Sequence, residues 1–280
     1  MSWRIRAEHT SRYRYAGPVY SSYNEARVTP LTTTAQLVLD ASVKVEPSTR
    51  PYRYLDYWGS VVHAFDIQQP HGELVVTGRS VVETSVPRPG STAATWSQLD
   101  DALLRDDHAE VLAATAWVPA DERIAEIAAE LRAANDPETA ARAAVAWVRD
   151  QLSYVSGSTG VHTSAVEAWE GGAGVCQDFA HLALAALRAM GIPARYCSGY
   201  LHPNADAGVG MTMEGESHAW VEYWTGDWHA VDPTIGWPIG ERHVLVARGR
   251  DYGDVAPLKG VFHGGPTGDL QVKVNLTRLG

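Results

Sequence analysis

The residue with the clearest chemical potential is Cys176, which follows a glycine-rich segment at residues 171–174. The apolar residues 179–190 come next and are followed by Gly191 and Pro193, a combination that ends a helix. Cys176 is therefore expected in the first turn of a buried helix, where free backbone N–H groups and the helix dipole favour the thiolate. This position predicts a nucleophilic cysteine, and the alternative is a small buried residue.

A cysteine nucleophile needs a base, and the base needs a group that orients it. His218 lies near the start of an alternating segment at residues 217–224, and Asp232 ends a second one at residues 228–232. The Thr-Gly-Asp turn between the segments predicts an antiparallel hairpin, with both side chains at its far end. The pattern favours a catalytic set of Cys176, His218 and Asp232. Without Cys176, the histidine and the aspartate would be as typical of structural residues as of catalytic ones.

The elements that must position these residues fall into two groups. Residues 1–90 contain three segments with β-branched enrichment or alternation, at 37–45, 61–67 and 74–82. Short strands without an intervening helix are typical of an antiparallel sheet or sandwich. The sequence therefore predicts an N-terminal antiparallel β sandwich.

A run of turn-forming residues at 87–92 separates this part from an alanine-rich part with helical periodicity. A helix is expected to end at residue 134, and a second begins after Asp136, an N-cap residue followed by proline. We therefore place a domain boundary at residue 90, with a β domain at 1–90 and an α+β domain at 91–280.

Composition excludes several classes of function. Acidic residues outnumber basic ones by 33 to 23, which argues against recognition of nucleic acid or of an anionic membrane surface. No apolar run reaches the ~18 residues that a membrane span needs, and the first six residues lack a signal-peptide core. Two cysteines in 280 residues do not form a disulfide framework. The sequence predicts a cytoplasmic protein with no nucleic-acid or membrane partner.

Four motifs resemble the transglutaminase-like superfamily. They are Gly-Val-Cys-Gln-Asp-Phe at 174–179, Arg-Ala-Met-Gly-Ile-Pro-Ala-Arg at 188–195, His-Ala-Trp-Val-Glu at 218–222 and Asp-Pro-Thr at 232–234. The resemblance implies a papain-like α+β core, in which a nucleophile helix packs on an antiparallel sheet. It also implies a catalytic triad, carried here onto Cys176, His218 and Asp232.

The resemblance extends to a bacterial branch of the superfamily with an N-terminal β domain. Residues 12–15, 18–19 and 24–27 are similar to the opening of that domain, and residues 249–257 are similar to the tail of the branch. Residues 95–135 match least specifically. The resemblance implies that residues 1–90 form this β domain and that residues 91–280 form the catalytic domain.

Further site residues follow from the same resemblance. The oxyanion of acyl transfer needs fixed donors, of which the backbone N–H of Cys176 is one. In this superfamily an aromatic residue upstream supplies a second donor, and Tyr154 is the best-placed candidate, with a core or rim tyrosine as the alternative. Trp220 is a candidate wall of the substrate groove, with a core residue as the alternative.

No metal or cofactor is expected. Animal transglutaminases use calcium, but no segment has the ligand spacing of an EF-hand loop. The histidines also lack the tight ligand pairing of a zinc motif. Those considered are His162, His181, His202, His218 and His229.

The expected reaction is thiol-dependent acyl transfer at an amide or peptide bond through a thioester on Cys176. The partner is then a peptide, a protein or a small amide. Water as acceptor gives a cysteine peptidase or amidase, which we favour because water is always present and no acidic cluster that would bind an amine is evident. A primary amine as acceptor gives a protein-glutamine transglutaminase. The alternative of another class is a non-catalytic binding or assembly module on the same fold.

Overall fold

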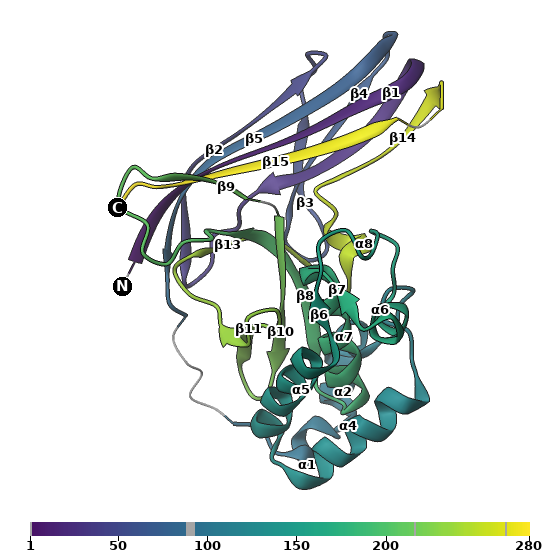
Figure 1. Ribbon diagram of the computed structural model, residues 1–280, viewed down its shortest axis with the longest axis vertical. Coiled ribbons are helices and arrows are strands. Elements are labelled where there is room, and N and C mark those ends of the chain that lie inside the picture. Colours follow the sequence, from purple (N-terminus) through teal and green to yellow (C-terminus); the bar gives the residue numbers. More distant parts are fainter. Residues whose placement is uncertain (1, 88–92, 216, 267) are drawn as a thin grey trace.

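A computed structural model describes residues 2–87, 93–215, 217–266 and 268–280, and shows a large β-sheet packed beside a smaller sheet and a group of helices (Figure 1). The larger sheet is antiparallel and has eight strands. They are β1 (Ser2–Thr29), β2 (Gln36–Glu46), β3 (Tyr52–Leu55), β4 (Val61–Ile67), β5 (His71–Ser85), β9 (Thr212–Gly215), β14 (Leu258–Gly264) and β15 (Asp269–Arg278).

The larger sheet folds over on itself because β1 is long enough to join two groups of strands. The first half of β1, up to Arg14, pairs with β5 and β15, whereas the second half, from Val19, pairs with β4 and β14. The two groups enclose a small apolar core that includes Val28 of β1, Phe65 of β4 and Leu74 of β5. The predicted antiparallel sandwich is therefore confirmed, with both layers belonging to one continuous sheet.

The smaller sheet has five strands in the order β12-β11-β10-β8-β13, all antiparallel. A parallel pair of two-residue strands, β6 and β7, lies apart from it. The bounds are β6 (Ser153–Tyr154), β7 (Ala173–Gly174), β8 (Ala194–Leu201), β10 (Ser217–Trp224), β11 (Trp228–Asp232), β12 (Trp237–Pro238) and β13 (His243–Gly249).

Helices cover one face of the five-stranded sheet. They are α1 (Trp96–Leu99), α2 (Ala102–Asp107), α3 (Ala109–Leu112), α4 (Glu122–Ala134), α5 (Pro137–Gln151), α6 (Ala165–Gly171), α7 (Cys176–Ala189) and α8 (Tyr252–Val255). Helix α7 contacts β8 and β10 on one side and α4, α5 and α6 on the other. It is therefore buried along its length, as its apolar composition predicts, and the side chains of Leu182, Leu184 and Leu187 are fully buried.

The two helices predicted before and after residue 135 are confirmed as α4 and α5. The carboxylate of Asp121 accepts hydrogen bonds from the first turn of α4, and that of Asp136 does the same for α5. These caps satisfy backbone donors that otherwise have no partner. Among the described residues, no helix has the length and apolar composition that crossing a bilayer requires.

Three strands from the second half of the chain lie in the larger sheet. β14 and β15 pair with β1, and β9 pairs with β15. The division into residues 1–90 and 91–280 therefore does not separate the two sheets, because the C-terminal segment returns to the β domain. Pairing between strands so far apart in the chain leaves no local sequence signal, so the sequence did not indicate that β14 and β15 join the β domain. The predicted boundary at residue 90 lies outside the described residues.

Candidate active site

The first turn of α7 holds Cys176 at the end of a tight glycine connection. Gly174 lies so close to Asp178 that a Cβ at position 174 would meet the Asp178 Cβ at 2.6 Å. This contact allows the backbone N–H of Val175 to donate to Asp178 Oδ2 at 2.8 Å, and the Thr159 hydroxyl donates to the same oxygen at 2.5 Å. The contacts of Asp178 with Val175 and Thr159 thus hold the first turn of α7 in place. Cys176 itself remains partly exposed.

The hairpin of β10 and β11 brings His218 and Asp232 together. The two strands pair antiparallel from Val221 opposite Val231 to the turn at residues 225–227. His218 Nε2 donates to Asp232 Oδ2 at 2.6 Å, and the Asp232 side chain is fully buried. His218 also lies near enough to Cys176 for the two side chains to interact. The structure therefore places Cys176, His218 and Asp232 in one series, with His218 in the middle.

The charges of this series follow from burial and hydrogen bonding. Burial alone would lower the pKa of His218, but its hydrogen bond to Asp232 and its interaction with Cys176 outweigh burial and raise the pKa to about 10. Burial would raise the pKa of Asp232, whereas its hydrogen bonds from His218 and His243 hold that pKa well below the usual range. At neutral pH an imidazolium therefore lies between a carboxylate and the cysteine, the arrangement that activates a thiol nucleophile.

His243, at the start of β13, is a member of this cluster that the sequence analysis missed. Its Nε2 lies 3.4 Å from Asp232 Oδ2, and the side chain is buried. Burial lowers the pKa of His243 more than its hydrogen bond to Asp232 raises it, so the ring is neutral at pH 7. No local motif marks this residue, because β13 is separated from β11 by two strands of the sheet.

The same three side chains form a candidate metal site. His218, Asp232 and His243 each offer one ligand atom, and these atoms lie within 4.8 Å of one another. An imidazole and carboxylate set of this kind suits Zn²⁺ or another divalent transition metal. A metal bound there would displace the hydrogen bonds that Asp232 receives from the two histidines. The cluster can therefore either bind a metal or let Asp232 orient His218, but it cannot do both at once.

The two supporting candidates lie on different sides of the cluster. Tyr154 is in β6, in register with Gly174 of β7, so its backbone lies beside the connection to Cys176, and its side chain is half exposed. Trp220 is fully buried, and its ring packs edge-on against His243 at 5.4 Å between centroids. The roles of Tyr154 as an oxyanion donor and of Trp220 as a groove wall stay predictions.

Two family models match this chain. The transglutaminase-like superfamily model matches residues 125–233, which contain Cys176, His218 and Asp232, and the bacterial transglutaminase-like N-terminal region matches residues 5–83. The chain belongs to the transglutaminase-like superfamily. Both the superfamily and its bacterial branch are thereby confirmed as predicted from the sequence motifs.

This transglutaminase-like chain also has relatives along nearly its whole length. An uncharacterized protein of Mycobacterium leprae (strain TN) is 49% identical over 99% of both chains. An uncharacterized protein of Mycobacterium tuberculosis (strain ATCC 25618 / H37Rv) is 32% identical and covers 93% of this chain and 88% of its own. The crystal structure of a candidate cysteine protease from Cytophaga hutchinsonii has a TM-score of 0.75 and 22% identity, over 99% of this chain and 98% of that one. The structural likeness shows that the two proteins share a fold.

Proposed function

We propose that this protein is a cysteine-dependent hydrolase of amide or peptide bonds. The observation that carries the proposal is the hydrogen bond between His218 and buried Asp232, with Cys176 beside His218 at the start of α7. A nucleophile, a base and a group that orients the base are the minimum set for acyl transfer. A purely structural role would not require Cys176 to stay accessible beside a charged imidazole.

The steps follow from the positions of the three side chains. The sulfur of Cys176 attacks the carbonyl carbon, and the backbone N–H of Cys176 at the start of α7 is aligned to receive the developing oxyanion. The intermediate collapses to a thioester as His218 gives its proton to the leaving amine. Water then attacks the thioester while His218 takes one of its protons, and the carbon–sulfur bond breaks, which releases the acid and returns the Cys176 sulfur and protonated His218 to their starting state. Asp232 holds the imidazole in one orientation throughout.

The three side chains do not determine which molecule accepts the acyl group, because both water and a primary amine can attack a thioester. We expect hydrolysis, since Cys176 is partly exposed and water therefore reaches it. The substrate class that fits this chemistry is a peptide, a protein or a small amide.

A peptide library tests the proposal across many candidate substrates at once. Wild-type protein and Cys176→Ala are each incubated with a tryptic digest of bacterial proteins and dansylcadaverine, and the products are identified by mass spectrometry. We expect new termini, or side-chain amides converted to acids, only with the wild type. Attachment of dansylcadaverine as the main product would instead show a transglutaminase. Identical peptides from both proteins would contradict an enzyme and favour a non-catalytic module.

A further inference from the structure

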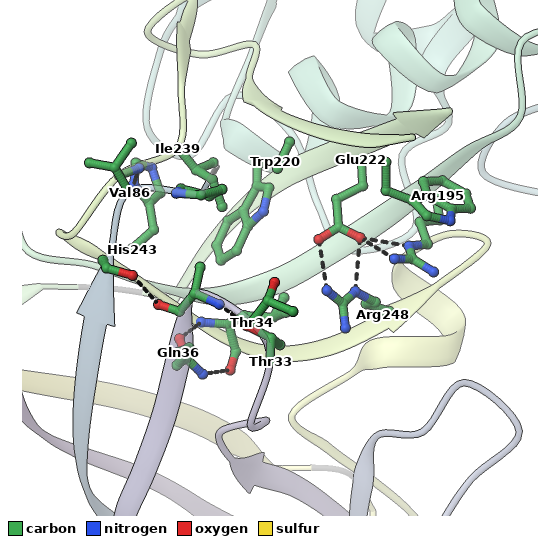
Figure 2. A pocket seen from close by; sticks show the side chains of 17 residues that line it. Thr33, Thr34, Gln36, Val86, Arg195, Trp220, Glu222, Ile239, His243 and Arg248 are labelled. Atoms are coloured by element: carbon green, nitrogen blue, oxygen red, sulfur yellow. Dashed lines mark hydrogen bonds and ion pairs between the residues drawn. The ribbon is translucent and has the colours of Figure 1, made fainter. Parts of the chain in front are cut away.

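A cavity of about 680 Å³ lies on the face of the five-stranded sheet opposite the helices (Figure 2). Residues 33–36 and 85–87 of the β domain close it from the other side. Its volume falls within the range of about 300–1,000 Å³ that is typical of small-molecule sites. Cys176 does not line the cavity, whereas His243 does. Cys176 is therefore not part of the cavity wall, but the cavity reaches the residue that contacts Asp232.

The cavity has a charged side built around Glu222. The buried Glu222 carboxylate accepts from Arg195 Nε at 2.6 Å and from Arg248 Nε and Nη2 at 2.8 and 2.9 Å (Figure 2). Two guanidinium groups therefore share one carboxylate. Two arginines against one glutamate give these three side chains one excess positive charge. Burial of an uncompensated charge is costly, so the site favours an anion.

The remaining walls supply an apolar surface and a guanidinium group held in place by stacking. Trp220, Ile239 and Leu245 line the cavity. Arg195 stacks on Trp228, with its guanidinium carbon 3.9 Å from the ring centroid. This stacking fixes the guanidinium plane in advance, which lowers the entropy cost of binding a ligand.

We propose that this cavity binds a small organic carboxylate. The carboxylate pairs with Arg195 and Arg248, and an apolar or aromatic group packs against Val86 and Ile239, which line the cavity and are not buried. A single negative charge matches the single excess positive charge of the two arginines and Glu222, whereas a phosphate carries more charge than the site can neutralise beside Glu222. The carboxylate belongs either to the amide substrate or to a separate ligand.

Calorimetric titration of Cys176→Ala with 3-phenylpropionate tests the proposal, with neutral 3-phenylpropionamide as the matched probe. We expect the acid to bind at least ~10-fold more tightly than the amide, because a charge-assisted contact is lost in the amide. No saturable binding of the acid, or equal affinity for both probes, would overturn the proposal.

Variants of the lining test the charge argument directly. Arg195→Gln removes the excess charge and should weaken binding of the acid by ~10-fold or more, whereas Glu222→Gln adds a charge and should tighten binding. Arg79→Gln, which changes an exposed arginine on β5, is the matched control and should bind as before. Melting curves show which variants are folded, and Arg195→Gln leaves Glu222 paired with Arg248 in any case. Unchanged affinity in folded Arg195→Gln would contradict the site.

Alkylation of Cys176 in the wild-type protein distinguishes the two sources of the carboxylate. If saturating 3-phenylpropionate protects Cys176 from iodoacetamide, the bound ligand extends to the nucleophile and the carboxylate is part of the substrate. If Cys176 still reacts, the cavity binds a separate ligand. Both outcomes support the site. Binding is measured in Cys176→Ala, so the acid can bind even if the protein proves not to be a hydrolase. Equally, the protein can prove to be a hydrolase even if the acid does not bind.

Discussion

Replacing Cys176 with alanine is expected to lower turnover of any peptide or amide substrate by about 10⁴-fold or more, because no other group in the series can form the thioester. The melting temperature should change little, since the side chain is small and partly exposed. Turnover of a substrate found in the peptide library, measured together with thermal melts, checks both parts of the prediction.

Cys197→Ala is the matched control for this experiment. Cys197 is fully buried on β8, and burial raises the pKa of its thiol well above the ordinary value. We expect near-normal turnover in this variant and a loss of about 1 kcal/mol in the free energy of unfolding. Activity retained by Cys176→Ala, or lost in Cys197→Ala without a change in stability, would mean that the wrong thiol is assigned.

Replacing Asp232 with asparagine is expected to lower turnover by roughly 10- to 10³-fold. The same exchange in a serine protease triad lowers kcat by about 10⁴-fold while the geometry is retained. A smaller effect is expected here because the thiol is more acidic than a serine hydroxyl and depends less on the base. The measurement is kcat for the variant and the wild type, with melts as a check on folding.

The structure makes this exchange informative, because Asp232 also has a turn-forming role. Its Oδ1 accepts from the backbone N–H of Thr234 at 2.9 Å, while Oδ2 accepts from His218. An asparagine can keep the first contact through its carbonyl oxygen but presents no charge to the imidazolium. Full activity in a folded Asp232→Asn would reduce this residue to a turn former and leave a dyad of Cys176 and His218.

Local signals in the sequence were sufficient for the elements that carry the proposed triad. The Asp136-Pro137 start of α5, the glycine connection to α7 and the turn at residues 225–227 each depend on residues within a few positions of one another. The hairpin register then follows from counting outward from the turn. These elements were predictable because the forces that form them are local.

The position of His243, the cavity and the pairing of β14 and β15 with β1 depend on contacts between segments far apart in the chain. The side-chain amide of Gln36, for example, donates to the backbone oxygen of Leu245 and accepts from its N–H, and this ties the β domain to β13. His243 reaches Asp232 only once β13 has joined the sheet, and the cavity exists only once the β domain covers Trp220. The return of β14 and β15 to β1 is of the same kind. No spacing of residue types indicates such pairings in advance.

The proposed activation of Cys176 by His218 is tested most directly by the rate of iodoacetamide alkylation of Cys176 in wild type and His218→Gln. Mass spectrometry of the Cys176 peptide measures the rate at pH 6 and pH 9, with buried Cys197 as an internal control. We predict at least ~10-fold faster alkylation in the wild type at pH 6, with a narrower difference at pH 9, where an ordinary thiol of pKa ~8.5 is itself mostly ionised. Equal rates in the two proteins at both pH values would contradict activation of Cys176 by His218.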